Sequence, residues 1–112
     1  MDDSPAPIIA GTLDLLILKT LAAGSFHGYG IAQHIKRLSR DVLRIEEGSL
    51  YPALQRMTVK GWIDSDWKKS PTGREARYYR LTSAGRKQLG QEESDLRRSM
   101  AATLRVLKLS QP

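Results

Sequence analysis

Gln55 and Arg56 are the residues of this sequence whose side chains are best suited to reading another macromolecule. They lie within residues 46–61, a segment that ends at Gly61. Glutamine and arginine present paired hydrogen-bonding groups that match the edges of DNA bases, and a helix N-terminus attracts phosphate. The chemistry open to this segment is therefore recognition of nucleic acid. A surface face that happens to carry few charges explains the segment equally well.

A helix must position these two side chains. Gly48 or Ser49 is expected to cap it, Pro52 to lie in its first turn and Gly61 to end it. Its apolar residues recur at helical spacing and predict a buried face made of Leu50, Leu54 and Met57. The opposite, outward face is then formed by Pro52, Gln55, Arg56 and Val59.

The residues of the sequence do not assemble into a catalytic or metal-binding set. There is no cysteine, and His27 and His34 are seven positions apart, whereas a helical zinc pair needs two histidines four apart. No phosphate-cradling glycine loop is present, and Glu46 and Glu47 precede a helix as partners of its dipole would. We therefore expect neither an enzyme nor a metal or cofactor site.

Composition predicts one domain with an anionic partner. In 112 residues, Lys and Arg outnumber Asp and Glu by 18 to 12, a formal charge of +6, which favours nucleic acid over a membrane surface. The absence of cysteine fits a reducing compartment, and the acidic N-terminus does not resemble a secretion signal. Without an apolar run long enough to span a bilayer, the expected location is the cytoplasm, away from membranes.

The first part of the chain predicts a flexible arm over residues 1–10 and then a helix that Thr12 caps, that runs to about Ala23 and that Gly24 ends. That helix is apolar almost all round, because Leu15 and Leu18 lie off its main stripe. Either of two neighbours could bury these leucines. A second copy of the chain is favoured over the chain's own C-terminal helix.

A second helix is expected over residues 29–39, with His27 as its cap or turn residue. Its inward residues are Ile31, Ile35 and Leu38. Residues 40–45 are expected to form a small strand or an extended link into the third helix. Two short helices joined in this way have helix-turn-helix proportions.

After Gly61 the apolar period changes to two, which predicts a β-hairpin with strands at residues 62–67 and 77–81. Ile63 and Trp67 share one strand face, and Tyr79 and Leu81 point inward. The hairpin carries five cations, namely Lys68, Lys69, Arg74, Arg77 and Arg80. These favour a wing that follows phosphates over a tip that is charged only for solubility. Both tryptophans are interpreted as core and sheet-packing residues.

The last helix is expected to begin at residues 82–85 and to continue to about Leu107. One stripe along it is made of Leu89, Leu96, Met100, Leu104 and Leu107. A helix this long cannot bury its far end against so small a body, so the stripe predicts a dimer seam rather than a frayed tail. The expected organisation is a winged helix-turn-helix domain at residues 11–82 followed by a dimerisation helix at residues 83–112.

At residue level the chain resembles the PadR family of bacterial transcriptional regulators, in the short form whose C-terminal part is a single helix. The resemblance covers roughly residues 11–89. It is carried by ordered motifs, which are Gly-Thr-Leu-Asp-Leu-Leu-Ile-Leu at 11–18, His-Gly-Tyr-Gly-Ile at 27–31, Glu-Gly-Ser-Leu-Tyr-Pro-Ala-Leu at 47–54, Gly-Trp-Ile at 61–63 and Arg-Tyr-Tyr-Arg-Leu-Thr-Ser-Ala-Gly at 77–85. It implies a mainly helical fold with a small β-hairpin and a homodimer that represses from a pseudo-palindromic operator.

The resemblance also implies which residues touch double-stranded DNA. The set is Tyr29, Ser49, Tyr51, Pro52, Gln55 and Arg56, with Lys60 at the end of the same helix and the wing cations Lys68, Lys69, Arg74 and Arg77. Tyr51 lies at the helix flank, so a phosphate contact suits it better than a base contact. Residues 83–112 contain no Phe, Tyr or Trp, so a planar aromatic effector is not supported and the identity of any small-molecule effector stays open. The alternative function is a winged-helix module whose basic wing meets an acidic protein.

Overall fold

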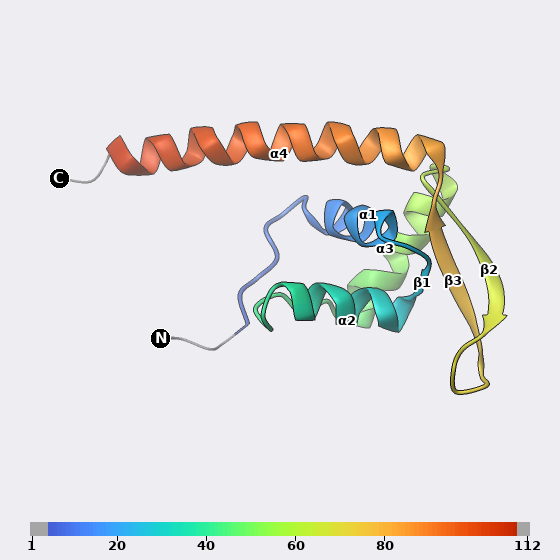
Figure 1. The fold of residues 1–112 in the computed structure, drawn as a ribbon. Helices are drawn as coiled ribbons and strands as arrows, with labels where there is room; N and C mark the ends of the chain where they lie inside the picture. The colour runs from blue at the N-terminus through green and yellow to red at the C-terminus, as the bar shows by residue number, and fades with distance from the viewer. Residues whose placement is uncertain (1–4, 110–112) are drawn as a thin grey trace.

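The computed structural model describes residues 5–109, which form a winged helix-turn-helix with a long C-terminal helix (Figure 1). The elements follow one another as α1 (Leu13–Ala22), β1 (Phe26–His27), α2 (Gly28–Leu38), α3 (Glu47–Val59), β2 (Ile63–Lys69), β3 (Glu75–Leu81) and α4 (Ser83–Leu109). This order confirms the predicted fold. It also adds a strand, β1, that the sequence did not predict.

α1 is the central element of the core, lying between α4 on one side and α2 with α3 on the other (Figure 1). Ile17 and Leu18 have no exposed surface, and Leu15 is 7 % exposed. Leu89 of α4 belongs to the same buried cluster. The expectation that a second chain covers Leu15 and Leu18 is therefore wrong, because α4 of the same chain packs on α1, as the alternative had it.

α2 begins where His27 caps it. The Nδ1 atom of His27 accepts a hydrogen bond of 2.9 Å from the backbone N–H of Gly30, which confirms the predicted role. Ile31 and Ile35 are buried, but Leu38 is 68 % exposed. The inward placement of Leu38 was wrong, because this last residue of α2 lies beyond the core that the preceding turns cover.

The link between α2 and α3 contains no strand; it turns at residues 39–42, where Arg40 and Asp41 have positive φ, and residues 43–46 then lead into α3. The backbone N–H of Ala6 donates a hydrogen bond of 3.0 Å to the carbonyl of Val42, so part of the N-terminal segment lies beside this link. Residues 1–4 of the predicted flexible arm lie outside the described residues. Flexibility of the arm stays a prediction.

α3 buries the predicted face, with Leu50, Leu54 and Met57 at most 2 % exposed. Its first helical residue is Glu47 and its N-cap is Glu46, which makes no side-chain capping bond. The expected cap at Gly48 or Ser49 is therefore wrong. The earlier start places Pro52 in the second turn, where its missing N–H leaves the Gly48 carbonyl without an intrahelical donor.

The end of α3 is as predicted. Gly61 has a φ of +77°, a left-handed conformation that glycine adopts without strain. The backbone N–H of Trp62 donates a hydrogen bond of 3.0 Å to the carbonyl of Met57, which closes the helix and turns the chain into the wing.

The wing is an antiparallel sheet in the order β1-β3-β2. β2 and β3 pair from Ile63 opposite Leu81 to Lys69 opposite Glu75, and β1 pairs along the other edge of β3. Ile63 is buried and Trp62 packs against the core, as expected. Trp67 is 64 % exposed, so its assignment to the core was wrong. It lies on the face predicted for it, but the hairpin has by then extended past the helices.

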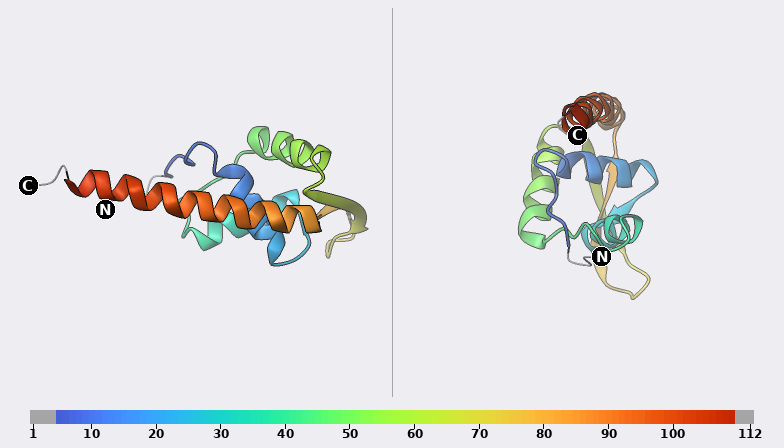
Figure 2. Two further views of the ribbon diagram at one scale, coloured as in Figure 1. Left: turned by 90° about the horizontal axis from the view of Figure 1, so that it is seen from above. Right: turned by 90° about the vertical axis from the view of Figure 1, so that its left-hand side faces the viewer.

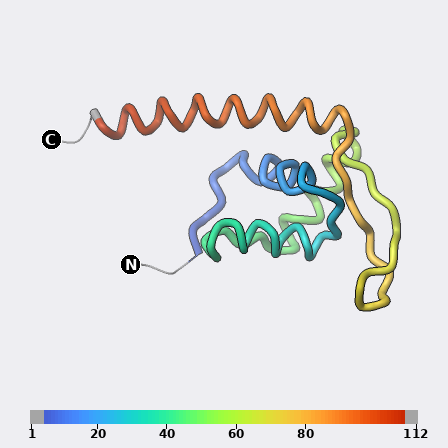
Figure 3. The backbone as a smooth tube through the Cα atoms, in the orientation of Figure 1, coloured from blue at the N-terminus to red at the C-terminus, as the bar shows by residue number. Residues whose placement is uncertain are grey.

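Thr82 caps the start of α4, because its Oγ1 accepts a hydrogen bond of 3.0 Å from the N–H of Gly85. Its first half lies along α1, and Lys19 and Glu93 form an ion pair of 3.4 Å between the two helices. Its second half extends beyond the body, giving extents of 58 × 34 × 22 Å (Figures 2 and 3). No helix in the described part of the chain has the length and apolar character needed to cross a membrane.

Replacing Gly85 by alanine is expected to destabilise the fold by about 1–3 kcal/mol or more, because an added methyl would overpack the junction of α4 and the wing. A Cβ at this position would lie 2.0 Å from the carbonyl oxygen of Trp62. Gly90, also in α4, is the matched control, since its Cβ would meet no atom within 4 Å. Gly90→Ala should stabilise by roughly 0.5–1 kcal/mol. Urea unfolding at one fixed protein concentration measures both, and equal effects would contradict the prediction.

Candidate nucleic-acid interface

The outward face of α3 is exposed, as its sequence predicts. Pro52 and Gln55 are exposed, and Val59 at the end of the helix is 81 % exposed. Tyr51, at the flank, is 46 % exposed. A shallow groove runs along this face between Tyr51, Pro52, Gln55 and Arg56. The outward face of α3 therefore presents one amide and few charges, as a helix that lies in the groove of a partner would.

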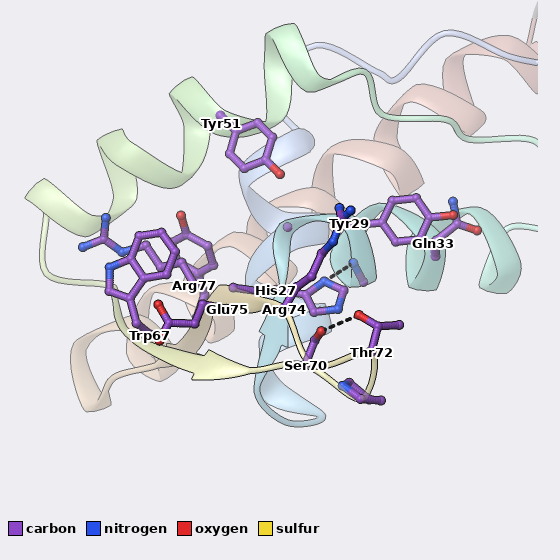
Figure 4. Close-up of a pocket in the computed structure, with 15 residues that line it drawn as sticks. His27, Tyr29, Gln33, Tyr51, Trp67, Ser70, Thr72, Arg74, Glu75 and Arg77 are labelled. Atoms are coloured by element: carbon purple, nitrogen blue, oxygen red, sulfur yellow. Dashed lines mark hydrogen bonds between the residues drawn. The ribbon is translucent and has the colours of Figure 1, made fainter.

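A cleft of about 880 Å³ lies beside this face, between the start of α2, α3 and the wing (Figure 4). Tyr29 comes from α2, Tyr51 from α3, and Trp67 and Arg77 from the wing strands. Tyr29 is 68 % exposed. Hydroxyl, indole and guanidinium donors thus converge from two helices and two strands on one cleft, next to the N-terminus of α2.

Gly28 is what allows α3 to approach the start of α2. A Cβ at Gly28 would lie 2.7 Å from the hydroxyl oxygen of Tyr51. The glycine of the motif at residues 27–31 therefore makes room for the tyrosine of the motif at residues 47–54. Tyr51 thus packs against the start of α2 while it also lines the cleft. Burial raises the pKa of Tyr79, deeper in the same cleft, so this phenol stays protonated and can donate.

The wing cations do not share one surface. Successive residues of a strand point to opposite faces, so Trp67 and Arg77 face the cleft while Lys68 and Arg80 lie on the other face. The Nε atom of Arg77 donates a hydrogen bond of 2.8 Å to Ser65, and its guanidinium lies 5.7 Å from the Trp67 ring centre. Arg77 is therefore held over the cleft.

Arg80 is already neutralised within the wing. It forms ion pairs of 2.7 Å with Asp64 and 2.5 Å with Asp66. The hydrogen bond from Arg80 holds the pKa of Asp66 below its usual value, and the two carboxylates raise the pKa of Arg80 in turn. Lys69 and Arg74, near the tip, form no ion pair within residues 5–109. Arg80 therefore contributes less to an anionic partner than the tip cations do.

Two residues predicted to contact DNA, one on α3 and one at its end, already have partners within the same chain. Arg56 pairs through Nη2 with Asp14 of α1. The ammonium of Lys60 lies 4.6 Å from the centre of the Trp62 ring. Both side chains remain on the surface, so their predicted contact with DNA stays a prediction, but each would have to leave a partner to make it.

The stripe predicted as a dimer seam divides into two parts. Leu89 is 7 % exposed and Leu96 is half-buried, and both pack on the core of the single chain. Met100, Leu104 and Leu107 are 45 %, 53 % and 54 % exposed on the second half of α4. The apolar stripe thus continues past the body that covers its beginning.

Sequence reasoning missed several features of this surface. Asp14 was not singled out, because its partner lies 42 residues away and no local pattern links the two. Exposure of Trp67 depends on the length of the hairpin, which the period of two does not give. Within residues 5–109, no group of three or more His, Asp or Glu side chains could hold a metal ion.

Comparison with known proteins places this surface in context. Residues 17–91 match the transcriptional regulator PadR-like family. The chain is 37 % identical over 82 residues to the transcriptional regulator Rv3488 of Mycobacterium tuberculosis, and the match covers 73 % of each protein.

Solved structures are similar over the same region. A transcriptional regulator from Clostridium thermocellum superposes with a TM-score of 0.79 at 28 % identity, covering 87 % of this chain and 94 % of that one. The Bacillus subtilis PadR protein, solved in complex with operator DNA, has a TM-score of 0.64 at 28 % identity and covers 71 % of this chain and 45 % of its own.

Proposed function

Since the chain belongs to the PadR-like family of transcriptional regulators, we propose that it binds a pseudo-palindromic operator as a homodimer and represses transcription by occupying it. Membership identifies the chain as a DNA-binding regulator and not as an enzyme. Repression and the palindromic operator rest on the family resemblance, and the surfaces described above support the binding of DNA.

The exposed face of α3 is the observation that carries the proposal. A helix of 13 residues is about 20 Å long and fits the major groove of B-form DNA, which is about 12 Å wide. Gln55 lies near the middle of this face, and its amide can pair with the N6 and N7 atoms of adenine. In this arrangement Pro52 and Ser49 approach the groove edge.

The cleft beside α3 supplies contacts to the DNA backbone in this proposal. Tyr29 and Tyr51 donate hydroxyl hydrogen bonds to phosphate from the two sides of the α2 N-terminus, where backbone N–H groups also favour an anion. Arg77 extends the same track on the wing, and Lys69 and Arg74 reach the adjacent groove from the tip. These contacts position the duplex but carry little sequence information.

Gln55→Ala tests whether α3 recognises the base sequence of the operator. We expect binding to the preferred operator to weaken by about 1–3 kcal/mol, with preference lost at one base pair per half-site, while binding to random duplex stays unchanged. Gln91→Ala is the matched control, because Gln91 is an exposed glutamine on α4 that bonds to Asp95. Equal losses of operator and random binding would show that Gln55 contacts the backbone and not a base.

Selection of bound fragments from a pool of random duplexes tests the function as a whole. We expect an enriched sequence with two related half-sites, centred one helical turn or a multiple of it apart. Enrichment of no sequence, together with tight and salt-tolerant co-purification of an acidic protein, would instead support the protein-interaction alternative.

A further inference from the structure

The ion pair between Arg56 and Asp14 joins α3, the helix proposed to enter the major groove, to the first turn of α1. Nη2 of Arg56 donates to Oδ1 of Asp14, and the two side chains are 48 % and 19 % exposed. Asp14 is therefore the less accessible partner, held at the surface of the body. Among the ion pairs within residues 5–109, this is the one that reaches α3.

A second ion pair fastens α1 on its other side, because Lys19 near the end of α1 pairs with Glu93 of α4. α1 is thus tied by charge to α3 at its start and to α4 near its end. α4 is the helix whose exposed second half carries the proposed dimer seam. The two ion pairs therefore connect α3 to α4 by way of α1.

Apart from Tyr51, which packs against Gly28 of α2, the buried contacts of α3 with the body are apolar. Leu50, Ala53, Leu54 and Met57 form its buried face. This packing fixes which face of α3 is buried, but apolar burial is non-directional and tolerates small rotations of the helix about its own axis. A charge-assisted hydrogen bond is short and directional. The bond to Asp14 is therefore the contact best suited to set how far α3 is turned.

The surroundings of Asp14 strengthen the need for Arg56. Glu92 of α4 lies nearby, and its Oε2 atom is buried without a hydrogen-bond partner among the described residues. Burial, and then the charge of Asp14, raise the pKa of Glu92, while Lys60 acts in the opposite direction. Removing Arg56 would leave two carboxylates at this junction of three helices with Lys60 as the nearby cation.

We propose that Arg56 is a positioning residue that, by binding Asp14, fixes the orientation of α3 relative to α4 and thereby the spacing of the two half-sites that the dimer accepts. This role rests on the proposed function. It gives Arg56 a different task from base reading, because the guanidinium acts on DNA only through the placement of α3 and Gln55.

The test compares Asp14→Asn, Arg56→Gln and the double variant on operators whose half-sites are moved apart or together by one base pair. We expect each single variant to lose about three- to ten-fold in affinity for the selected operator and to discriminate less against altered spacing. The double variant should lose no more than either single variant, since both remove one contact. The base preference within each half-site and the salt slope should stay those of the unsubstituted protein.

Arg98→Gln is the matched control, because Arg98 is an exposed arginine of α4 that forms no ion pair within residues 5–109. It should change neither affinity nor spacing. A change of base preference in Arg56→Gln that Asp14→Asn does not share would overturn the proposal and make Arg56 a base contact. Unchanged spacing discrimination in both single variants would also overturn it. Urea unfolding of each variant identifies loss of folding, and in that case Asp14→Glu, which keeps the charge, should restore the spacing preference.

Failure of this proposal can be distinguished by experiment from failure of the proposed function. If the unsubstituted protein selects no duplex, operator binding itself is wrong. If it selects an operator and the variants behave like it, only the role assigned to the Asp14–Arg56 pair is wrong.

Discussion

Replacing Met100 and Leu104 by glutamate is expected to leave the protein as single chains at micromolar concentration and to weaken operator binding by at least about 100-fold. Both residues lie on the second half of α4, where they are 45 % and 53 % exposed. In a two-fold symmetric seam each carboxylate would appear twice and lose its water without a cation to replace it. The second half-site would then no longer bind as part of the same molecule.

A control on the opposite face of α4 separates the seam from the added charge. Ser94→Glu with Ala102→Glu adds the same two carboxylates to the helix, but both positions are exposed and lie away from the stripe. This variant should remain dimeric and bind the operator nearly as well as the unsubstituted protein. Sedimentation measures the assembly state and duplex titration the affinity. A dimer that survives Met100→Glu with Leu104→Glu would disprove a seam on this stripe.

Much of the fold follows from local periodicity. The spacing of Leu50, Leu54 and Met57 predicts both the helix and its buried side, because a helix repeats every 3.6 residues and leaves one face for the core. The change to a period of two after Gly61 likewise predicts the hairpin. β1 could not be predicted, because its two residues are too few to show a period and their pairing with β3 spans about half the chain.

Periodicity shows that a face of a helix is buried, but it does not show which element packs against that face. The all-round apolar character of α1 correctly indicates that both sides of this helix are buried. It does not distinguish a second chain from α4, and α4 is the answer for Leu15 and Leu18. The same limit applies to the interface, since exposed Gln55 follows from helix geometry while the engagement of Arg56 by Asp14 depends on how α1 and α3 pack.

Operator affinity is expected to fall by about 10³- to 10⁵-fold when salt rises from about 50 to 200 mM, if the dimer neutralises about six to ten phosphates. Each neutralised phosphate releases condensed counterions, so log K against log salt should be linear with a slope near −0.9 per phosphate. The excess of 18 basic over 12 acidic residues makes such contacts available. Affinity that stays flat over this range would contradict backbone binding.

The structure makes this prediction specific to individual wing residues. Arg74→Gln should make the slope less steep by about 2 per dimer, because a tip cation without an ion pair is lost from each half-site. Arg80→Gln removes the same charge but should alter the slope by less than about 0.5, since Asp64 and Asp66 already hold Arg80 on the face away from the cleft. Titrations of one duplex at several salt concentrations give both slopes. Equal changes would mean that Arg80 leaves its carboxylates on binding and that both faces of the wing contact phosphate.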